Sequence, residues 1–151
     1  GEDLNHPVEI REFAGIYYHM HSIAGGKAVL AHCPRDRVEQ IIDRWGLPER
    51  TDQTITTRDA LLEELDRIRE QGYALNDEEF TNGLRAVGKA VIGADGTPLG
   101  SISISGPVYR LNGELYEVDL PHILTETVTD LETSIREKRK AALADDSSAE
   151  T

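Results

Sequence analysis

The stretch from Leu84 to Ser105, LRAVGKAVIGADGTPLGSISIS, decides the fold class. Two runs that suit β-strands, residues 84–92 and 99–105, lie on either side of the pair Asp95-Gly96. An Asp-Gly pair between two such runs is a strong local signal for a β-hairpin, because both residues adopt the backbone angles of a tight turn at little cost. The sequence therefore predicts two adjacent antiparallel strands.

The second strand of this hairpin is predicted to have two chemically different faces. Side chains alternate along a strand, so Ser101, Ser103 and Ser105 share one face, and Ile102 and Ile104 share the other. The isoleucine face is expected to pack on helices. The serine face has two interpretations. It is either an ordinary solvated face or the floor of a small pocket for a polar ligand.

The remaining elements favour a single α+β domain, in which helices pack on an antiparallel sheet. Strands and helices do not alternate regularly, which argues against a parallel sheet built from β-α units. Alternating or aromatic-rich runs predict strands, and apolar residues at helical spacing predict helices. Further strands are expected at 8–13, 16–21 and 73–75, and helices at 28–33, from Pro34 to Gly46, from Thr57 to Gly72, and from near Pro121 through Ile135.

The composition excludes several classes of protein. The 151 residues carry a net charge of −12, which argues against a nucleic-acid-binding surface on this chain. Cys33 is the only cysteine, so no internal disulfide can form, and a cytoplasmic location is expected. No apolar run approaches the roughly 20 residues of a membrane span. The first residue is Gly rather than Met, which suggests a fragment or a trimmed chain.

The segment IAGGKAVLAHCP, residues 23–34, resembles a phosphate loop but lacks two of its parts. A phosphate loop has the pattern G-x-x-x-x-G-K-[ST]. Here Ala28 follows Gly26-Lys27 where a magnesium-binding hydroxyl is needed, and His21 occupies the position of the first glycine. Two interpretations remain: a Gly-Gly turn without a ligand, or a turn whose backbone N–H groups hold a small anion such as a carboxylate.

Three other groups of residues have side chains that could carry chemistry. His19 and His21 lie two apart in a predicted strand, a spacing that can bind a metal, although no second ligand pair is evident. Adjacent His32 and Cys33 point about 100° apart on a helix, so they do not form a catalytic dyad by themselves. The acidic run 77–79 has no placed partner for acid–base chemistry. The sequence therefore predicts no enzyme, no metal and no cofactor, with a His19/His21 metal module as the alternative.

Three segments together resemble the effector-binding domain of IclR-type transcription regulators. They are HSIAGGKAVLAHCP at residues 21–34, TITTRDALLEELDRIREQGYALNDEEFTNGLRAVG at 54–88, and DGTPLGSISISGP at 95–107. The resemblance implies a GAF-like antiparallel sheet flanked by helices and a pocket for a small carboxylate or aromatic acid. It also implies a dimer or tetramer that binds DNA through an N-terminal winged helix-turn-helix, which is absent here along with the first strands. The acidic composition resembles that of a halophilic member.

The resemblance also implies which residues contact the effector. By position they are Ala24, Gly25, Asn76, Leu84, Ala86, Ser103 and Ser105. Family members often carry aspartate at Asn76 and cysteine at Ala86, so the ligand of this chain is expected to differ. If Lys89 faces the pocket, it favours an anionic ligand. The expected boundaries are an effector-binding domain at 1–143 and a disordered acidic tail at 144–151.

Overall fold

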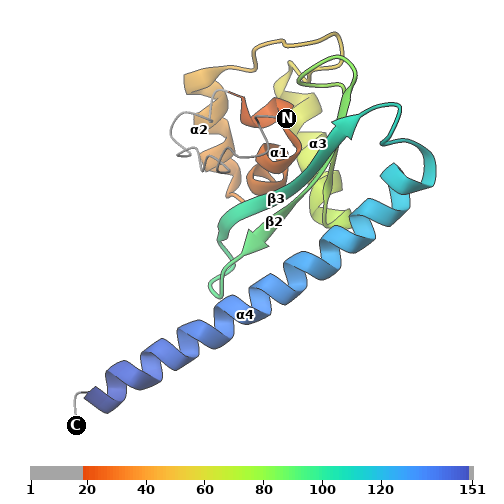
Figure 1. The fold of residues 1–151 in the computed structure, drawn as a ribbon. Coiled ribbons are helices and arrows are strands. Elements are labelled where there is room, and N and C mark those ends of the chain that lie inside the picture. The colour runs from red at the N-terminus through yellow and green to blue at the C-terminus, as the bar shows by residue number, and fades with distance from the viewer. Residues whose placement is uncertain (1–18, 150–151) are drawn as a thin grey trace, which may run out of the picture.

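The computed structural model describes residues 19–149, and within them it confirms the predicted α+β class. A three-stranded antiparallel sheet has the order β1-β2-β3, with helices on both faces (Figure 1). The strands are β1 (Ala74–Asp77), β2 (Leu84–Ile92) and β3 (Pro98–Pro107). The helices are α1 (Ala24–Leu30), α2 (Arg35–Trp45), α3 (Arg58–Gln71) and α4 (Leu120–Ala149), with a 3-10 turn at Met20–Ser22 and a π-helical turn at Leu115–Asp119.

The hairpin forms as the sequence predicts. β2 and β3 pair antiparallel over their length, with Ala86 opposite Ser105 and Gly88 opposite Ser103. Gly96 in the turn has a φ of 86°, a left-handed angle that glycine adopts without steric cost. β1 adds to the other side of β2 and aligns Asn76 with Ala86.

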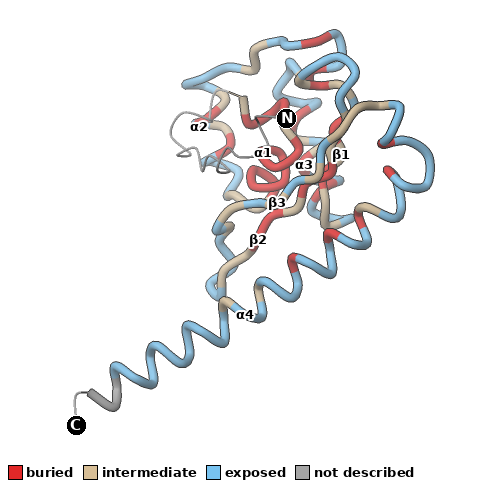
Figure 2. The backbone as a smooth tube through the Cα atoms, in the orientation of Figure 1, coloured by how far each residue is buried: buried red, intermediate tan, exposed pale blue. Residues whose placement is uncertain are grey.

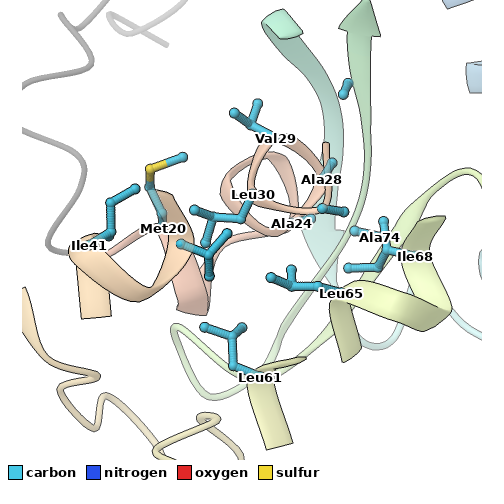
Figure 3. Packing of buried hydrophobic residues seen from close by; sticks show 13 residues of the cluster. Met20, Ala24, Ala28, Val29, Leu30, Ile41, Leu61, Leu65, Ile68 and Ala74 are labelled. Atoms are coloured by element: carbon cyan, nitrogen blue, oxygen red, sulfur yellow. The ribbon is translucent and has the colours of Figure 1, made fainter. Parts of the chain in front are cut away.

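Two hydrophobic cores cover the two faces of the sheet (Figure 2). The first lies under α1, α2 and α3 and contains Leu30, Leu61 and Ile68 (Figure 3). The second lies between the sheet and α4 and contains Val87 and Val128. Burying large aliphatic side chains stabilises a fold by roughly 1.5–3 kcal/mol each, so these two layers fix the sheet between its helices.

The structure differs from the sequence predictions at the first helix and at the end of the second predicted strand. The strand expected at 8–13 lies outside the described residues. The described end of the strand expected at 16–21 was predicted wrongly, because residues 20–22 form a 3-10 turn. α1 begins at Ala24 rather than Ala28, so Gly25 and Gly26 lie inside a helix and not in a turn. Packing against the sheet overrides the low helix propensity of glycine.

The C-terminal segment differs as well. α4 continues to Ala149, six residues into the segment that the sequence predicts to be a disordered tail. The helix crosses the sheet and then extends away from the rest of the molecule (Figure 1). In the described part of the chain, no helix has the length and apolar character needed to cross a bilayer.

Candidate functional site

The candidate site is the sheet face that turns toward α1. Ser101, Ser103 and Ser105 alternate as exposed residues along β3, whereas Ile102 and Ile104 pack into the core under α4. The predicted division of β3 into an apolar and a hydroxylated face is therefore confirmed. The hydroxyl groups form a polar row on the side of the sheet that α1 covers only in part.

Helix α1 approaches this face closely because both elements carry glycine at the contact. A Cβ on Gly88 would lie 2.6 Å from the carbonyl carbon of Ala24. A Cβ on Gly25 would lie 2.5 Å from Oγ of Ser101 and 2.9 Å from Oγ of Ser103. Since real Cβ contacts are never so short, these glycines are what allow the helix backbone to sit against the serine row.

Register places the other predicted residues beside this contact. Asn76, Ala86 and Ser105 stand opposite one another on the three strands. Leu84 precedes Ala86 by two residues, so it shares the same face, and it is 42% exposed. The seven residues that the family resemblance implies as ligand contacts thus gather on one face of the sheet and on the helix against it.

The side chain of Asn76 has a structural role in this arrangement. Its Nδ2 donates to the Ser22 carbonyl at 2.5 Å, and its Oδ1 accepts from the Glu79 backbone N–H at 3.0 Å. An aspartate here would lack the donor and would place a carboxylate against the Ser22 carbonyl oxygen. This geometry gives a physical reason why the chain carries the amide.

Lys27 is the residue whose role sequence reasoning missed. Its side chain is fully buried. Its ammonium group donates to Glu64 Oε2 at 3.1 Å, to the Leu75 carbonyl at 2.7 Å and to Glu79 Oε1 at 2.8 Å. These three acceptors match the three N–H groups of a lysine ammonium. Lys27 therefore joins α1, α3 and the loop after β1, and its charge is already neutralised by protein carboxylates.

One sequence signal pointed to this role. Glu64 lies three residues after Leu61, on the edge of the apolar stripe of α3, where a carboxylate needs a buried partner. No local pattern connects it to Lys27, which is 37 residues away.

The acidic loop after β1 is tied down rather than solvated. Glu79 is buried, and its second carboxylate oxygen accepts from the Asp77 N–H at 3.0 Å. Thr51 and Thr54 donate their hydroxyl protons to the carbonyls of Glu78 and Glu79, at 2.5 and 2.6 Å. These contacts hold the loop beside the serine face.

The other two carboxylates of this acidic run also have structural partners. Asp77 pairs with Arg85 at 2.9 Å, and Glu78 accepts from the Gly83 N–H at 2.7 Å. The loop therefore supports the fold of the site, and its carboxylates are not arranged for acid–base chemistry.

The histidine pair of the alternative interpretation lies at the start of the described chain. His21 is 2% exposed, and its Nε2–H donates to the Pro48 carbonyl at 2.9 Å. Burial lowers the pKa of His21, which keeps the ring neutral. His19 packs edge-on against the ring of Phe80. Among the residues that the structure describes, no three His, Cys, Asp or Glu side chains are grouped as metal ligands.

Cys33 and Lys89 lie away from the serine face. The Cys33 thiol donates to the Val29 carbonyl at 3.4 Å, and burial raises its pKa, which disfavours the thiolate that a nucleophile needs. Lys89 donates to the Gly72 carbonyl at 2.6 Å. Lys89 lies two residues after Val87, so both side chains are on the face that α4 covers. Lys89 therefore does not contribute a charge to the candidate site.

Comparison with known proteins identifies the family. Residues 5–135 match the family described as bacterial transcriptional regulator IclR, C-terminal. The chain is 32% identical over 116 residues to the probable HTH-type transcriptional regulator ArcR of Halobacterium salinarum, which covers 77% of this chain and 44% of that protein. The chain spans less than half the length of the curated relatives that it matches.

Solved structures agree with this assignment. The C-terminal domain of the Escherichia coli regulator KdgR is 33% identical with a TM-score of 0.70, covering 76% of this chain and 69% of that one. The inducer-binding domain of the Acinetobacter transcription factor PobR, a double mutant in complex with 3-hydroxybenzoic acid, is 29% identical with a TM-score of 0.69, covering 75% and 65%. The relatives are transcription regulators and not enzymes. This chain belongs to the family of IclR C-terminal domains of transcription regulators.

Proposed function

We propose that this domain senses a small carboxylate or aromatic acid and passes the signal to a DNA-binding domain of the same regulator in the cytoplasm. The observation that carries the proposal is the exposed serine row facing α1. Small-ligand sites use a mixture of polar and apolar groups. Here the polar groups are the hydroxyls of Ser103 and Ser105 and the backbone near Gly25, and the apolar groups are Leu84 and Ala86.

The class of ligand is inferred from the chemistry of this face. Hydroxyl and backbone N–H groups can donate to a carboxylate, and Leu84 with Ala86 offers an apolar surface for the rest of the molecule. The PobR domain, whose structure holds 3-hydroxybenzoic acid, has the same fold and supports the aromatic-acid class. Lys27 is excluded as the anion partner because its three donors are satisfied.

Sensing requires that the ligand bind one arrangement of the regulator better than another. The ligand would touch α1 from one side and β3 from the other, so it would favour one spacing between them. We propose that a homodimer or homotetramer converts this preference into a change in DNA binding.

The experiment is thermal unfolding of the chain against a panel of small carboxylic and aromatic acids. A ligand at 100 times its dissociation constant adds roughly 2.7 kcal/mol of stability, which raises Tm by about 5–10 °C at this size. We expect one class of acid to produce such a shift. No shift with any acid would contradict the sensor proposal.

A matched pair of variants tests the location of the site. Ser105→Leu fills the polar row at a position away from the glycine contact, and it should abolish the ligand-induced shift while leaving the fold intact. Ser134→Leu makes the same change at an exposed position of α4 and should leave the shift unaltered. Equal responses of both variants would place the site elsewhere.

A further inference from the structure

As far as the structure describes it, the last part of α4 contributes no buried side chain to the fold. From Arg136 to Asp146, each side chain that the structure describes is exposed, and the helix projects beyond the body of the molecule (Figure 2). The match to the family ends at residue 135. A helix whose whole circumference faces solvent gains no stability from burial within this chain, and a contact with a partner would add the burial that it lacks.

The charges of this projecting helix are segregated along its length. The segment 136–140 is basic, with four cations (Arg136, Lys138, Arg139 and Lys140) around Glu137, which is unusual in a chain of net charge −12. Asp145 and Asp146 give the helix an acidic end. In the described chain, none of these six residues forms an ion pair within 4.0 Å. The four cations lie at least five residues from the two aspartates, beyond the spacings of three and four at which residues of one helix pair.

One face of the helix combines these charges with an apolar residue. A continuous stripe along the helix is formed by residues at spacings of three and four: Arg136, then Arg139 or Lys140, then Leu143 and Asp146. Leu143 is 61% exposed and sits in the middle. From its N-terminal end, the stripe has the order cation, leucine, anion. From its C-terminal end, it has the order anion, leucine, cation.

We propose that the projecting helices of two copies of this chain pair antiparallel about Leu143. In this arrangement Leu143 meets its counterpart, and Lys140 of each copy faces Asp146 of the other. The contact uses the same surface on both copies, as twofold symmetry requires. A parallel pairing would set cations against cations, so the charge order selects the antiparallel one.

A cavity on the body of the molecule fits the same arrangement. It has a volume of about 90 Å³ and lies between the hairpin turn and α4, with Arg136 and Arg139 among its lining residues. Its two carboxylates already accept hydrogen bonds: Glu132 from the Ile92 N–H at 2.7 Å, and Asp95 from Thr97 at 2.7 and 3.1 Å. The antiparallel pairing sets Asp146 of the second helix opposite Lys140, one residue from Arg139.

The charges favour a second copy over another acidic partner. The basic residues alone would also attract a nucleic acid or another acidic protein. Asp145 and Asp146 would repel those partners. Only a partner with cations opposite these two aspartates can form ion pairs with them. This chain is itself such a partner.

The test is the molar mass of the 151-residue chain in solution, measured by sedimentation and light scattering over a range of concentrations. We expect concentration-dependent dimers that are weaker in about 1 M salt than in about 0.05 M salt, since salt screens exposed charges. Two charge-reversal variants, R139E/K140E and D145K/D146K, should each fail to dimerise through this helix.

A one-to-one mixture of the two variants is the decisive measurement. In the antiparallel pair, the reversed cations of one variant face the reversed anions of the other, and the unreversed residues also match. The mixture should therefore recover the dimer that neither variant forms alone. A mixture that stays dissociated, or variants that associate as the original chain does, would overturn the proposal.

A single-residue comparison controls for net charge. K140E changes the stripe, whereas K138E makes the same charge change about 140° around the helix from Leu143. K140E should weaken self-association by about tenfold, because each dimer loses two exposed charge pairs. K138E should have a much smaller effect, and equal effects of the two variants would contradict the proposed face. Circular dichroism confirms that both variants remain folded.

Discussion

At the scale of single residues, Lys27 shows how far a role can lie from its sequence motif. The motif places it in a loop that could hold an anion. The structure buries it between Glu64 and Glu79, which lie 37 and 52 residues further along the chain. Removing one partner of a buried ion pair costs about 3–5 kcal/mol, because the remaining charge is left unpaired. Lys27 is therefore a structural residue beside the site and not a ligand contact.

His21 leads to a prediction about pH. Burial lowers its pKa in the folded protein, so as the pH falls the unfolded chain binds a proton before the folded one does. The free energy of unfolding should therefore have its full value above about pH 6.5 and should decrease as the pH falls below it. His21→Gln keeps a donor for the Pro48 carbonyl and removes the titration, so urea unfolding from pH 7 to pH 5 should show a shallower loss.

His122→Gln is the matched control for this measurement. His122 is 72% exposed in its side chain, and its Nε2 lies 3.2 Å from Glu126 Oε1. This variant should follow the original pH profile. If His21→Gln followed it too, the buried histidine would not be a source of the acid sensitivity.

At the scale of elements, the contact between α1 and the sheet determines the shape of the candidate site. Gly88 on β2 lets the backbone of α1 approach to a distance that a Cβ would prevent, and Gly25 on the helix leaves room for the hydroxyl groups of Ser101 and Ser103. Glycine in a helix lowers its stability by roughly 1 kcal/mol relative to alanine. In α1 this loss accompanies the close contact between the helix and the sheet. The serine row therefore lies at the edge of this contact.

Gly88→Ala tests the contact directly. The new Cβ would meet the backbone of Ala24, which cannot move without displacing α1, so the variant should lose about 1–3 kcal/mol of stability. It should also lose its response to the ligand. Gly100→Ala is the control on β3, where nothing lies within 4 Å of the new Cβ. Its stability should stay the same or rise by up to about 1 kcal/mol, and two equal losses would contradict the role of Gly88.

At the scale of the whole molecule, two cores hold the sheet and α4 extends beyond them. Leu124 and Val128 lie in the second core, and Ile135 is the last residue of α4 that packs against it. Glu132 also fixes the hairpin by accepting from the Ile92 N–H. The helix thus has a structural half up to Ile135 and a projecting half after it (Figure 1).

Two truncations separate these halves. Removing residues 141–151 should change the free energy of unfolding by less than about 1 kcal/mol in dilute solution, because exposed side chains contribute little. Removing 132–151 should cost about 2 kcal/mol or more, because it deletes the packing of Ile135 and leaves the Ile92 N–H without its acceptor. Urea unfolding measures both. Similar losses from the two truncations would show that the projecting half stabilises the fold.

Local chemistry explains which sequence predictions succeeded. The hairpin at 84–105 was predicted because Asp95-Gly96 and the alternation of serine and isoleucine act within a few residues. The helix from Arg58 to Gln71 was predicted because Thr57 caps it, with its hydroxyl accepting from the Ala60 N–H, and because Gly72 ends it in a left-handed conformation. The start of α1 was misplaced because glycine normally breaks a helix, and only packing on the sheet reverses that preference.

By itself, the sequence determined the α+β class, the two faces of β3 and, through its family resemblance, the residues that gather at the candidate site. The α+β class and the two faces of β3 depend on turn chemistry and periodicity, which neighbouring residues carry, whereas the site residues follow from the family resemblance alone. Only the tertiary structure decided that Lys27 is neutralised inside the protein, that Lys89 faces away from the site and that α4 continues to Ala149. The physical reason is that burial and pairing depend on residues far apart in the chain, and a local pattern does not record which of them meet.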